Sequence, residues 1–547
     1  MGTLRAAQDL MDAVLDQRNG PHPAPDLFQQ WEALGPEMYN LKVAEATVLA
    51  RLGGLLHDLC HIPFGHSIED DLGVLAPHDA NPKRFEILWS QLSDELQALV
   101  NQDLGRALRH LILSKEMVQD GSKEAEAAAR YPFVTDIVGN TICADLLDYL
   151  ERDHQAMGLP AKLGHRFLDG FYVTRSDALY HPQRMAIKIV RNGQLRSDVI
   201  TELFKFLRYR YELSERGLVH HTKLAADAMV GKTLEMWNDA IRAEKAVTLS
   251  PGLSKRQPAD IDELLSRAKS ISPDLPQKIQ KEAQDELENQ FLKHGDDGLL
   301  EWLLDWAGSS AASDRRKAGI LELAKMLLER RLYKLVGKSS QSSRSMASEI
   351  HGKHGGFEQR RRLEEEVARY AGLDHRWQVV LWIPPPQMRL KAADVLIDTD
   401  GQVLPLKDYD HTSMQRGKDI YESHEALWAV SVYIHPSIAG DDRKKQVILA
   451  WLRKHMGVEW EAATESRTLE QLAAETVATE LDLPRSKEQD LAVGISGYKG
   501  DKTFEALCKQ IVQIAEARSV PAEIQSDDLE DDDQLDELQP NESTKLL

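Results

Sequence analysis

Apolar residues recur every three or four positions along most of the first two thirds of the chain. Two such runs are Ala44, Val48, Leu49, Leu52, Leu55 and Leu56, and Ile320, Leu323, Met326 and Leu327. This spacing places the apolar side chains on one face of an α-helix. The pattern therefore predicts an all-α body from residue 4 to residue 338, interrupted by proline-containing loops at 20–25 and 249–258.

The pattern changes after residue 338. Residues 339–358 are rich in serine and glycine, which predicts a flexible linker. Between residues 377 and 436 the apolar residues cluster or alternate as they do in strands, with Asp400-Gly401 as a hairpin turn. Residues 469–517 return to helical spacing. The predicted fold class is mainly α, an all-helical core with a helical extension, followed by a small C-terminal α+β unit.

Charge is distributed unevenly along the chain. There are 67 Lys and Arg against 88 Asp and Glu, which gives a formal net charge of −21. Ten acidic residues and no basic residue lie between Glu523 and Glu542. We expect residues 526–547 to form a disordered acidic tail, because like charges repel and few apolar residues are present. The acidity argues against a nucleic-acid-binding surface over the whole chain, so an anionic substrate would need a local group of cations.

Several other classes of protein are not expected. No run approaches the roughly 18 apolar residues of a membrane helix, and no signal-peptide block follows Met1. We therefore expect a soluble, cytoplasmic protein without a membrane partner. Its cysteines, Cys60, Cys143 and Cys508, are too scattered for a disulfide framework or a zinc knuckle. Any metal would be held by histidines and carboxylates.

Histidines gather at the end of one apolar helix, in the segment RLGGLLHDLCHIPFGH at 51–66. The adjacent His57 and Asp58 offer a divalent cation one imidazole and one carboxylate. His61 lies one helical turn further along, and His66 follows the turn at Pro63. Three histidines within ten residues of an apolar segment favour a functional cluster, with satisfied core histidines as the alternative interpretation.

A second polar group lies in ICADLLDYLERDH at 142–154. Helical spacing predicts one polar stripe that consists of Asp145, Asp148, Tyr149, Arg152 and Asp153, opposite Leu146, Leu147 and Leu150. A solvated helix face is the ordinary explanation for such a stripe. Its occurrence after the His57-Asp58 pair favours a site instead.

The two groups occur in the order typical of the HD phosphohydrolase superfamily, a His-Asp pair followed by a helical Asp. The segment HDLCHIPFGHSIED resembles the HDxxHxPFxH motif of deoxynucleoside triphosphate triphosphohydrolases, which include bacterial dGTPase-like enzymes and the vertebrate SAM-and-HD-domain enzyme. ADLLDYLERD is similar to their DxxDYxxRD segment, and RRLYKLVG at 330–337 is similar to RxLYKxVG. The resemblance spans residues 1 to about 340.

This resemblance implies that His57, Asp58 and Asp145 bind a divalent metal. Manganese, magnesium, iron and zinc all suit such a donor set. His78, followed by Asp79, would be the general acid at the leaving group. His61 is grouped with these two as a catalytic residue.

The resemblance also implies contacts to a nucleoside triphosphate. His66 would hold a substrate phosphate, and Arg210 would lie against a phosphate. Tyr149 and Asp153 would contact the sugar. His220, next to His221, would line the pocket, and an ordinary helix start is an equal alternative for this pair.

The implied reaction is hydrolysis at the α-phosphate, which releases a deoxynucleoside and inorganic triphosphate. Two alternatives are a hydrolase of another nucleotide or phosphate ester, and a non-catalytic nucleotide-binding relative. The first histidine ligand of the family would fall before residue 1, so we expect either an upstream histidine or water to take its place. Leu146 stands where the vertebrate enzyme has a lysine.

The resemblance, together with the apolar spacing and composition along the chain, predicts a domain organisation. The predicted parts are an HD core at 1–235, a helical extension at 236–338, the linker at 339–358, the α+β unit at 359–525 and the tail at 526–547. Because relatives assemble through the helices and the C-terminal unit, we expect a homo-oligomer in which that unit serves assembly or regulation. A nucleic-acid partner is not implied.

Overall fold

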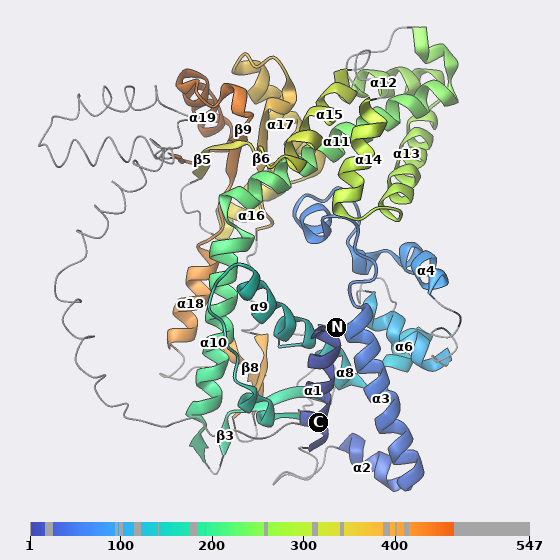
Figure 1. Cartoon of the computed structure of the whole chain (residues 1–547), viewed down its shortest axis with the longest axis vertical. Helices are drawn as coiled ribbons and strands as arrows, with labels where there is room; N and C mark the ends of the chain where they lie inside the picture. Colours follow the sequence, from blue (N-terminus) through green and yellow to red (C-terminus); the bar gives the residue numbers. More distant parts are fainter. Residues whose placement is uncertain are drawn as a thin grey trace, which may run out of the picture. The chain divides into compact units, whose positions relative to one another are not determined.

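The computed structural model describes most of residues 2–463 (Figure 1). The chain divides into two compact units, Met1–Ala463 and Thr464–Leu547, and the second unit lies outside the described residues. Within the first unit the residues that are not described are 17–25, 93, 95–96, 98–101, 114–121, 140–141, 175–182, 192, 256–260, 309–314, 340–343, 387–393, 400–401 and 410–414. The predictions for 20–25, 469–517, 526–547 and Cys508 therefore fall outside the described part.

Helices dominate the described residues, which confirms the prediction of a mainly α fold. The first helices are α1 (Gly2–Asp16), α2 (Asp26–Ala33), α3 (Pro36–Leu56), α4 (Pro82–Gln91), α6 (Gln102–Ile112), α7 (Lys123–Ala128), α8 (Pro132–Gly139) and α9 (Ala144–Ala156). One face of α3 packs against α1, α6 and α8, and Leu10, Leu49 and Phe133 are buried in the core they share. Among the helices described, none is long and apolar enough to cross a membrane.

A mixed four-stranded sheet lies beside these helices, in the order β1-β2-β7-β8. The strands are β1 (Phe171–Thr174), β2 (Arg184–Lys188), β7 (Leu396–Asp398) and β8 (Val403–Pro405). β7 and β8 form the predicted hairpin, with Leu396 opposite Pro405. β2 pairs in parallel with β7, where Ile187 faces Ile397. A two-stranded ribbon follows β2 and consists of β3 (Val190–Arg191) and β4 (Gln194–Leu195).

The prediction of an all-α body up to residue 338 is wrong between residues 171 and 195, where the described residues include the four strands β1 to β4. Each of these strands is short, five residues at most. β2 also depends on its pairing with β7, about 200 residues later in the chain. Helical periodicity in the flanking segments masked strands that tertiary pairing stabilises.

Long helices follow the ribbon. They are α10 (Ser197–Leu213), α11 (His221–Leu249), α12 (Ile261–Ile271), α13 (Leu275–Phe291), α14 (Asp296–Gly308) and α15 (Arg315–Leu328). α11 is in contact with α12, α13 and α15 along its length (Figure 1). For this reason every residue from Ala228 to Ala243 on α11 is buried, including charged residues.

A second four-stranded sheet has the order β10-β5-β9-β6 and is antiparallel throughout. Its strands are β5 (Lys334–Ser339), β6 (Val379–Trp382), β9 (Ser431–Ile434) and β10 (Trp460–Ala462). The remaining helices are α16 (Arg344–His354), α17 (Phe357–Tyr370), α18 (Gln415–Glu425) and α19 (Asp442–Met456). β6 is in contact with both α11 and α17, and its four residues are buried.

These sheets change two expectations about the organisation of the chain. The segment 339–358 was expected to be a flexible linker, but α16 occupies most of it and buries Ala347 and Ile350. The α+β unit was expected to begin at 359, yet β5 comes from the preceding segment and β7 completes the sheet of β1 and β2. Serine and glycine content did not reveal this helix, because Ala347 and Ile350 are buried against residues that are distant in sequence.

Buried ion pairs fasten α17 to α11. Lys232 Nζ lies 2.8 Å from Glu235 Oε2 and also pairs with Glu364. The second oxygen of Glu364, Oε1, accepts the backbone N–H of Leu381 at 2.7 Å. These three charged side chains are almost fully buried, so the pairing satisfies groups that would otherwise be costly to bury.

A glycine on α3 permits its close packing against α8. A Cβ atom on Gly53 would lie only 2.7 Å from Val138 Cγ2, and a β-branched side chain in a helix cannot easily move away. We expect Gly53→Ala to lower the free energy of unfolding by roughly 1–2 kcal/mol, measured by urea denaturation. The matched control is Gly139→Ala, where nothing lies within 4 Å; an equal loss in both variants would contradict the packing argument.

Candidate metal centre

The end of α3 presents His57 and Asp58 side by side. α3 ends at Leu56, and His57 keeps a helical backbone as its C-cap. His57 Nδ1–H donates to the carbonyl of Gly54 at 3.1 Å. This hydrogen bond leaves Nε2 as the ligand atom and fixes the ring orientation, as the outer hydrogen bond of a metal-bound histidine does.

Asp145 reaches the same point from α9. It lies in the first turn of that helix, which begins at Ala144. His57 Nε2 is 3.4 Å from Asp145 Oδ1 and 3.1 Å from Asp58 Oδ2. One ligand atom from each of the three residues lies within 4.8 Å of the others. The fold thus brings together the three residues for which a metal-binding role was expected.

The chemistry of this group fits a divalent cation. His57 Nε2 is buried and forms no hydrogen bond of acceptable geometry, so this atom is available as a ligand. One imidazole and two carboxylates suit manganese, iron, zinc or magnesium. The site can therefore hold a divalent metal, and its donors do not select one.

The two carboxylates next to His57 also affect its protonation. Burial by itself would lower the pKa of His57, but the negative charges of Asp145 and Asp58 close to Nε2 outweigh it and raise the pKa to about 10. For Asp58, burial would raise the pKa, and the neighbouring His57 and His61 hold it well below the usual range instead. A cation in this place would compensate the carboxylates as the imidazole proton does.

Three further histidines form a cluster next to the metal centre. The ring centroid of His61 lies 3.8 Å from that of His78 and 4.6 Å from that of His66. The chain turns sharply between His61 and His66, where Phe64 and Gly65 have φ angles of +66° and +42°. His61 Nε2 is 3.4 Å from Asp58 Oδ1, which connects the histidine cluster to the metal centre.

A buried carboxylate, Glu69, holds this cluster together. It accepts hydrogen bonds from His61 Nδ1 at 3.0 Å, from the His78 backbone N–H at 3.0 Å and from His78 Nδ1 at 3.2 Å. Arg84 Nη1 and the backbone N–H of Ile62 donate to its other oxygen at 3.1 and 3.2 Å. Glu69 thus orients two histidines at once.

Sequence reasoning did not single out Glu69 or Arg84. Glu69 lies within the HDLCHIPFGHSIED segment, three residues after His66, so its place in the motif was a usable signal. Its burial and its pairing with Arg84 are tertiary features. The acid expected beside His78 was Asp79, whereas the carboxylate in contact with the His78 ring is that of Glu69; a role for Asp79 stays a prediction.

The protonation state of the cluster follows from these contacts. Burial would raise the pKa of Glu69, but hydrogen bonds from His61 and His78 outweigh it and place the pKa well below the usual range. Burial would lower the pKa of His61, but Asp58 and Glu69 raise it to about 9. At neutral pH His61 is therefore a cation beside an anionic Glu69. His66, which is more exposed, pairs with Asp70 at 2.5 Å.

The other expected substrate contacts are partly brought together. The guanidinium of Arg210 lies over the ring of Tyr149, 5.1 Å from its centroid. Asp153 is one turn along α9 from Tyr149. His220 is the N-cap of α11, where its ring accepts the backbone N–H of Thr222 at 3.3 Å. This contact favours the helix-start interpretation of His220, and no contact places it at the metal centre in the described part of the chain.

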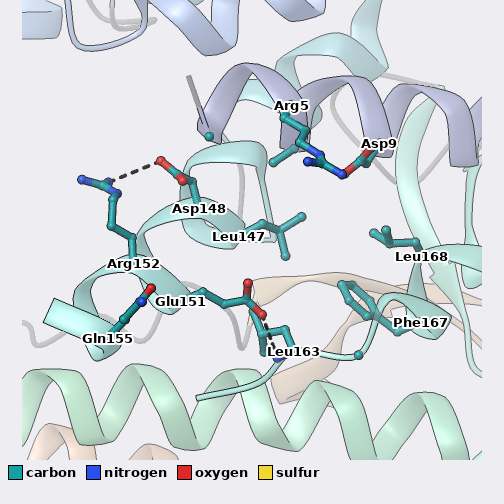
Figure 2. Close-up of a pocket in the computed structure, with 13 residues that line it drawn as sticks. Arg5, Asp9, Leu147, Asp148, Glu151, Arg152, Gln155, Leu163, Phe167 and Leu168 are labelled. Atoms are coloured by element: carbon teal, nitrogen blue, oxygen red, sulfur yellow. Dashed lines mark hydrogen bonds and ion pairs between the residues drawn. The ribbon is translucent and has the colours of Figure 1, made fainter. Parts of the chain in front are cut away.

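The polar residues of α9 do not form one stripe as expected. Asp148 and Arg152 line a pocket of about 460 Å³ together with residues of α1 and of the segment 163–168 (Figure 2). Asp148 Oδ2 accepts the hydroxyl of Thr3 at 3.1 Å and lies 3.4 Å from Arg152 Nη2. Asp148 therefore anchors α1, while Asp145 three residues earlier belongs to the metal centre.

No protein-family model matches the sequence, and no curated protein matches it. Among solved structures, the fold is similar to a phosphohydrolase from Bacteroides thetaiotaomicron VPI-5482, with 16% sequence identity and a TM-score of 0.43. This likeness covers 79% of the present chain and 86% of that chain.

Proposed function

We propose that this protein is a metal-dependent hydrolase that converts deoxynucleoside triphosphates to deoxynucleoside and inorganic triphosphate. The observation that carries the proposal is the convergence of His57, Asp58 and Asp145, with ligand atoms within 4.8 Å of one another. The adjoining histidine cluster supplies the cationic and proton-donating groups that phosphoryl transfer needs. The three motifs shared with triphosphohydrolases suggest the substrate.

In this proposal the metal is held by His57, Asp58 and Asp145. A divalent cation there would polarise the phosphate and lower the pKa of a bound water. His61, protonated at neutral pH, and His66 would take part of the phosphate charge. The ring of Tyr149, held against Arg210, would form a flat wall for the sugar.

The reaction requires a proton donor at the leaving 5′ oxygen. A water molecule releases one proton to the solvent as its oxygen forms a bond to the α-phosphorus, and the bond from that phosphorus to the 5′ oxygen breaks. His78 would give its proton to the 5′ oxygen as the deoxynucleoside leaves. Glu69 orients this ring through Nδ1, so that the other ring nitrogen is free to face the leaving group.

One observation favours a second candidate, a hydrolase of another phosphate ester. Leu146 is 4% exposed, so the position where the vertebrate enzyme has a lysine contributes no cation to a substrate here. A nucleotide with fewer phosphates, or another phosphate ester, would need fewer cations. The two candidates differ in their products, since the second would release orthophosphate or pyrophosphate.

The test is product analysis with the purified full chain. We expect inorganic triphosphate from at least one deoxynucleoside triphosphate in the presence of manganese, and none after chelation. A panel of nucleoside mono-, di- and triphosphates, scored for orthophosphate, pyrophosphate and triphosphate, separates the two candidates. Nucleotide binding without any turnover under all four metals would refute both candidates as nucleotide hydrolases and would favour a non-catalytic nucleotide-binding protein.

A further inference from the structure

Helix α3 has apolar residues on two opposite faces. One face is buried against α1, α6 and α8 and includes Leu49 and Leu56. The other face exposes large apolar side chains, namely Met38 (40% exposed), Leu41 (48%), Val48 (39%) and Leu55 (43%). Of the ten large apolar side chains that are exposed in the described residues, four lie on this helix and a fifth, Leu34, lies just before it. A helix that is apolar on both sides is normally covered on both sides.

The exposed residues have the spacing of a helix-pairing seam. Leu41, Val48 and Leu55 are seven residues apart, and the exposed residues Glu37, Ala44 and Arg51 repeat with the same period between them. Alternation of three and four residues with a seven-residue repeat is the pattern by which one helix packs along another. We call these six residues the outer stripe of α3.

The charges on the outer stripe indicate what covers it. Glu37 and Arg51 are 14 residues apart, about 21 Å along the helix, so they cannot pair with each other in one chain. Two parallel copies of α3 would place like charges together. In two antiparallel copies, Glu37 of each copy faces Arg51 of the other, about a centre at Ala44.

We infer that the outer stripe of α3 binds a second copy of this chain, antiparallel and about a twofold axis near Ala44. A twofold contact uses the same surface on both partners and must be self-complementary. The outer stripe meets that condition, because its acidic and basic residues are equally far from its centre. A different partner protein would not require this symmetry. This inference rests on the surface of α3 and does not depend on the proposed activity.

The first test is the mass of the full chain in solution, measured by sedimentation velocity over a concentration series. We expect a dimer, and we expect Val48→Glu to weaken the dimer at least tenfold because a charge would enter the apolar seam. The matched control is Ile271→Glu at the end of α12, an exposed apolar residue (56%, against 39% for Val48) outside the outer stripe. At concentrations low enough for the wild-type chain to be monomeric, thermal unfolding should be unchanged in both variants, since both side chains are then on the surface.

The second test uses the charges and the twofold axis. Glu37→Arg and Arg51→Glu should each weaken the dimer severalfold, and the double variant should restore it, because the pairs form only between copies. Ala44→Cys should form a disulfide-linked dimer on oxidation, and Lys281→Cys on α13 should not. A monomeric wild-type chain, or a dimer that Val48→Glu leaves intact, would overturn the inference. A double variant as weak as the single variants would overturn the antiparallel arrangement.

Discussion

Replacing Asp145 with asparagine is expected to abolish high-affinity binding of the divalent metal and with it hydrolysis. The substitution keeps the size of the side chain but removes one of two negative charges around His57. Loss of an outer partner of a metal ligand costs about 10- to 100-fold in affinity, so loss of a ligand should cost at least about 100-fold. Manganese affinity is measured by titration calorimetry, and turnover by release of phosphate products.

The matched control for this prediction is Asp148→Asn, on the same helix one turn further along. Asp148 accepts the Thr3 hydroxyl at 3.1 Å and lines the pocket that α9 forms with α1 and residues 163–168 (Figure 2). The Asp148→Asn variant should therefore retain metal affinity and turnover, with only a small loss of stability. Equal losses of metal in the two variants would show that α9 contributes general negative charge and no specific ligand.

Replacing Glu69 with glutamine is expected to lower the free energy of unfolding by about 3 kcal/mol and to lower turnover at least about tenfold. The carboxylate is buried and accepts from His61, His78 and Arg84. Glutamine has one acceptor oxygen and adds an NH₂ donor that faces other donors. Urea denaturation gives the stability. The control Glu45→Gln on α3 removes a partly exposed pair with Lys42, while the glutamine oxygen can still accept the Tyr131 hydroxyl, and it should cost less than about 1 kcal/mol.

The difference in the free energy of unfolding between wild type and Glu69→Gln should depend on pH. The pKa of Glu69 is lower in the folded chain than its ordinary value. The ionised carboxylate therefore stabilises the fold above its ordinary pKa, and this stabilisation is lost as the pH falls. The folded-state pKa of His61 is raised to about 9, so its contribution is complete below its ordinary pKa of about 6.5 and is lost as the pH rises through 9. The stability difference between wild type and Glu69→Gln should thus be largest near pH 5 to 6.5 and smaller on both sides. A difference that does not change between pH 3 and pH 10 would contradict the ionic pairing of Glu69.

Local regularities explain which parts of the site could be predicted. His57, Asp58, His61 and His66 are close in sequence, and one helix end followed by a sharp turn brings them together whatever the rest of the fold does. Glu69 is also near in sequence, but its importance comes from burial and from Arg84, 15 residues further on. Neither the burial of Glu69 nor its pairing with Arg84 can be predicted from the composition of the segment.

The division of α9 shows a different limit. Asp145 and Asp148 differ by one helical turn, and spacing alone placed them on one polar stripe. In the structure α1 packs against that helix, and Asp148 accepts a hydrogen bond from Thr3. Asp145 lies instead at the candidate metal centre. A stripe on a helix becomes two sites when a neighbouring helix lies along its edge, and the position of that neighbour is not a local property.

The sequence by itself determined the mainly α class, the hairpin of β7 and β8, the strands β6 and β9, and the residues offered to a metal. All of these depend on interactions between residues a few positions apart, which periodicity and turn residues report directly. Only the tertiary structure decided the joining of Asp145 to His57, the parallel pairing of β2 with β7, the use of α16 as a packed helix and the exposure of the outer stripe of α3. These depend on which distant segments exclude water from one another, and that is decided by the packing of the whole unit.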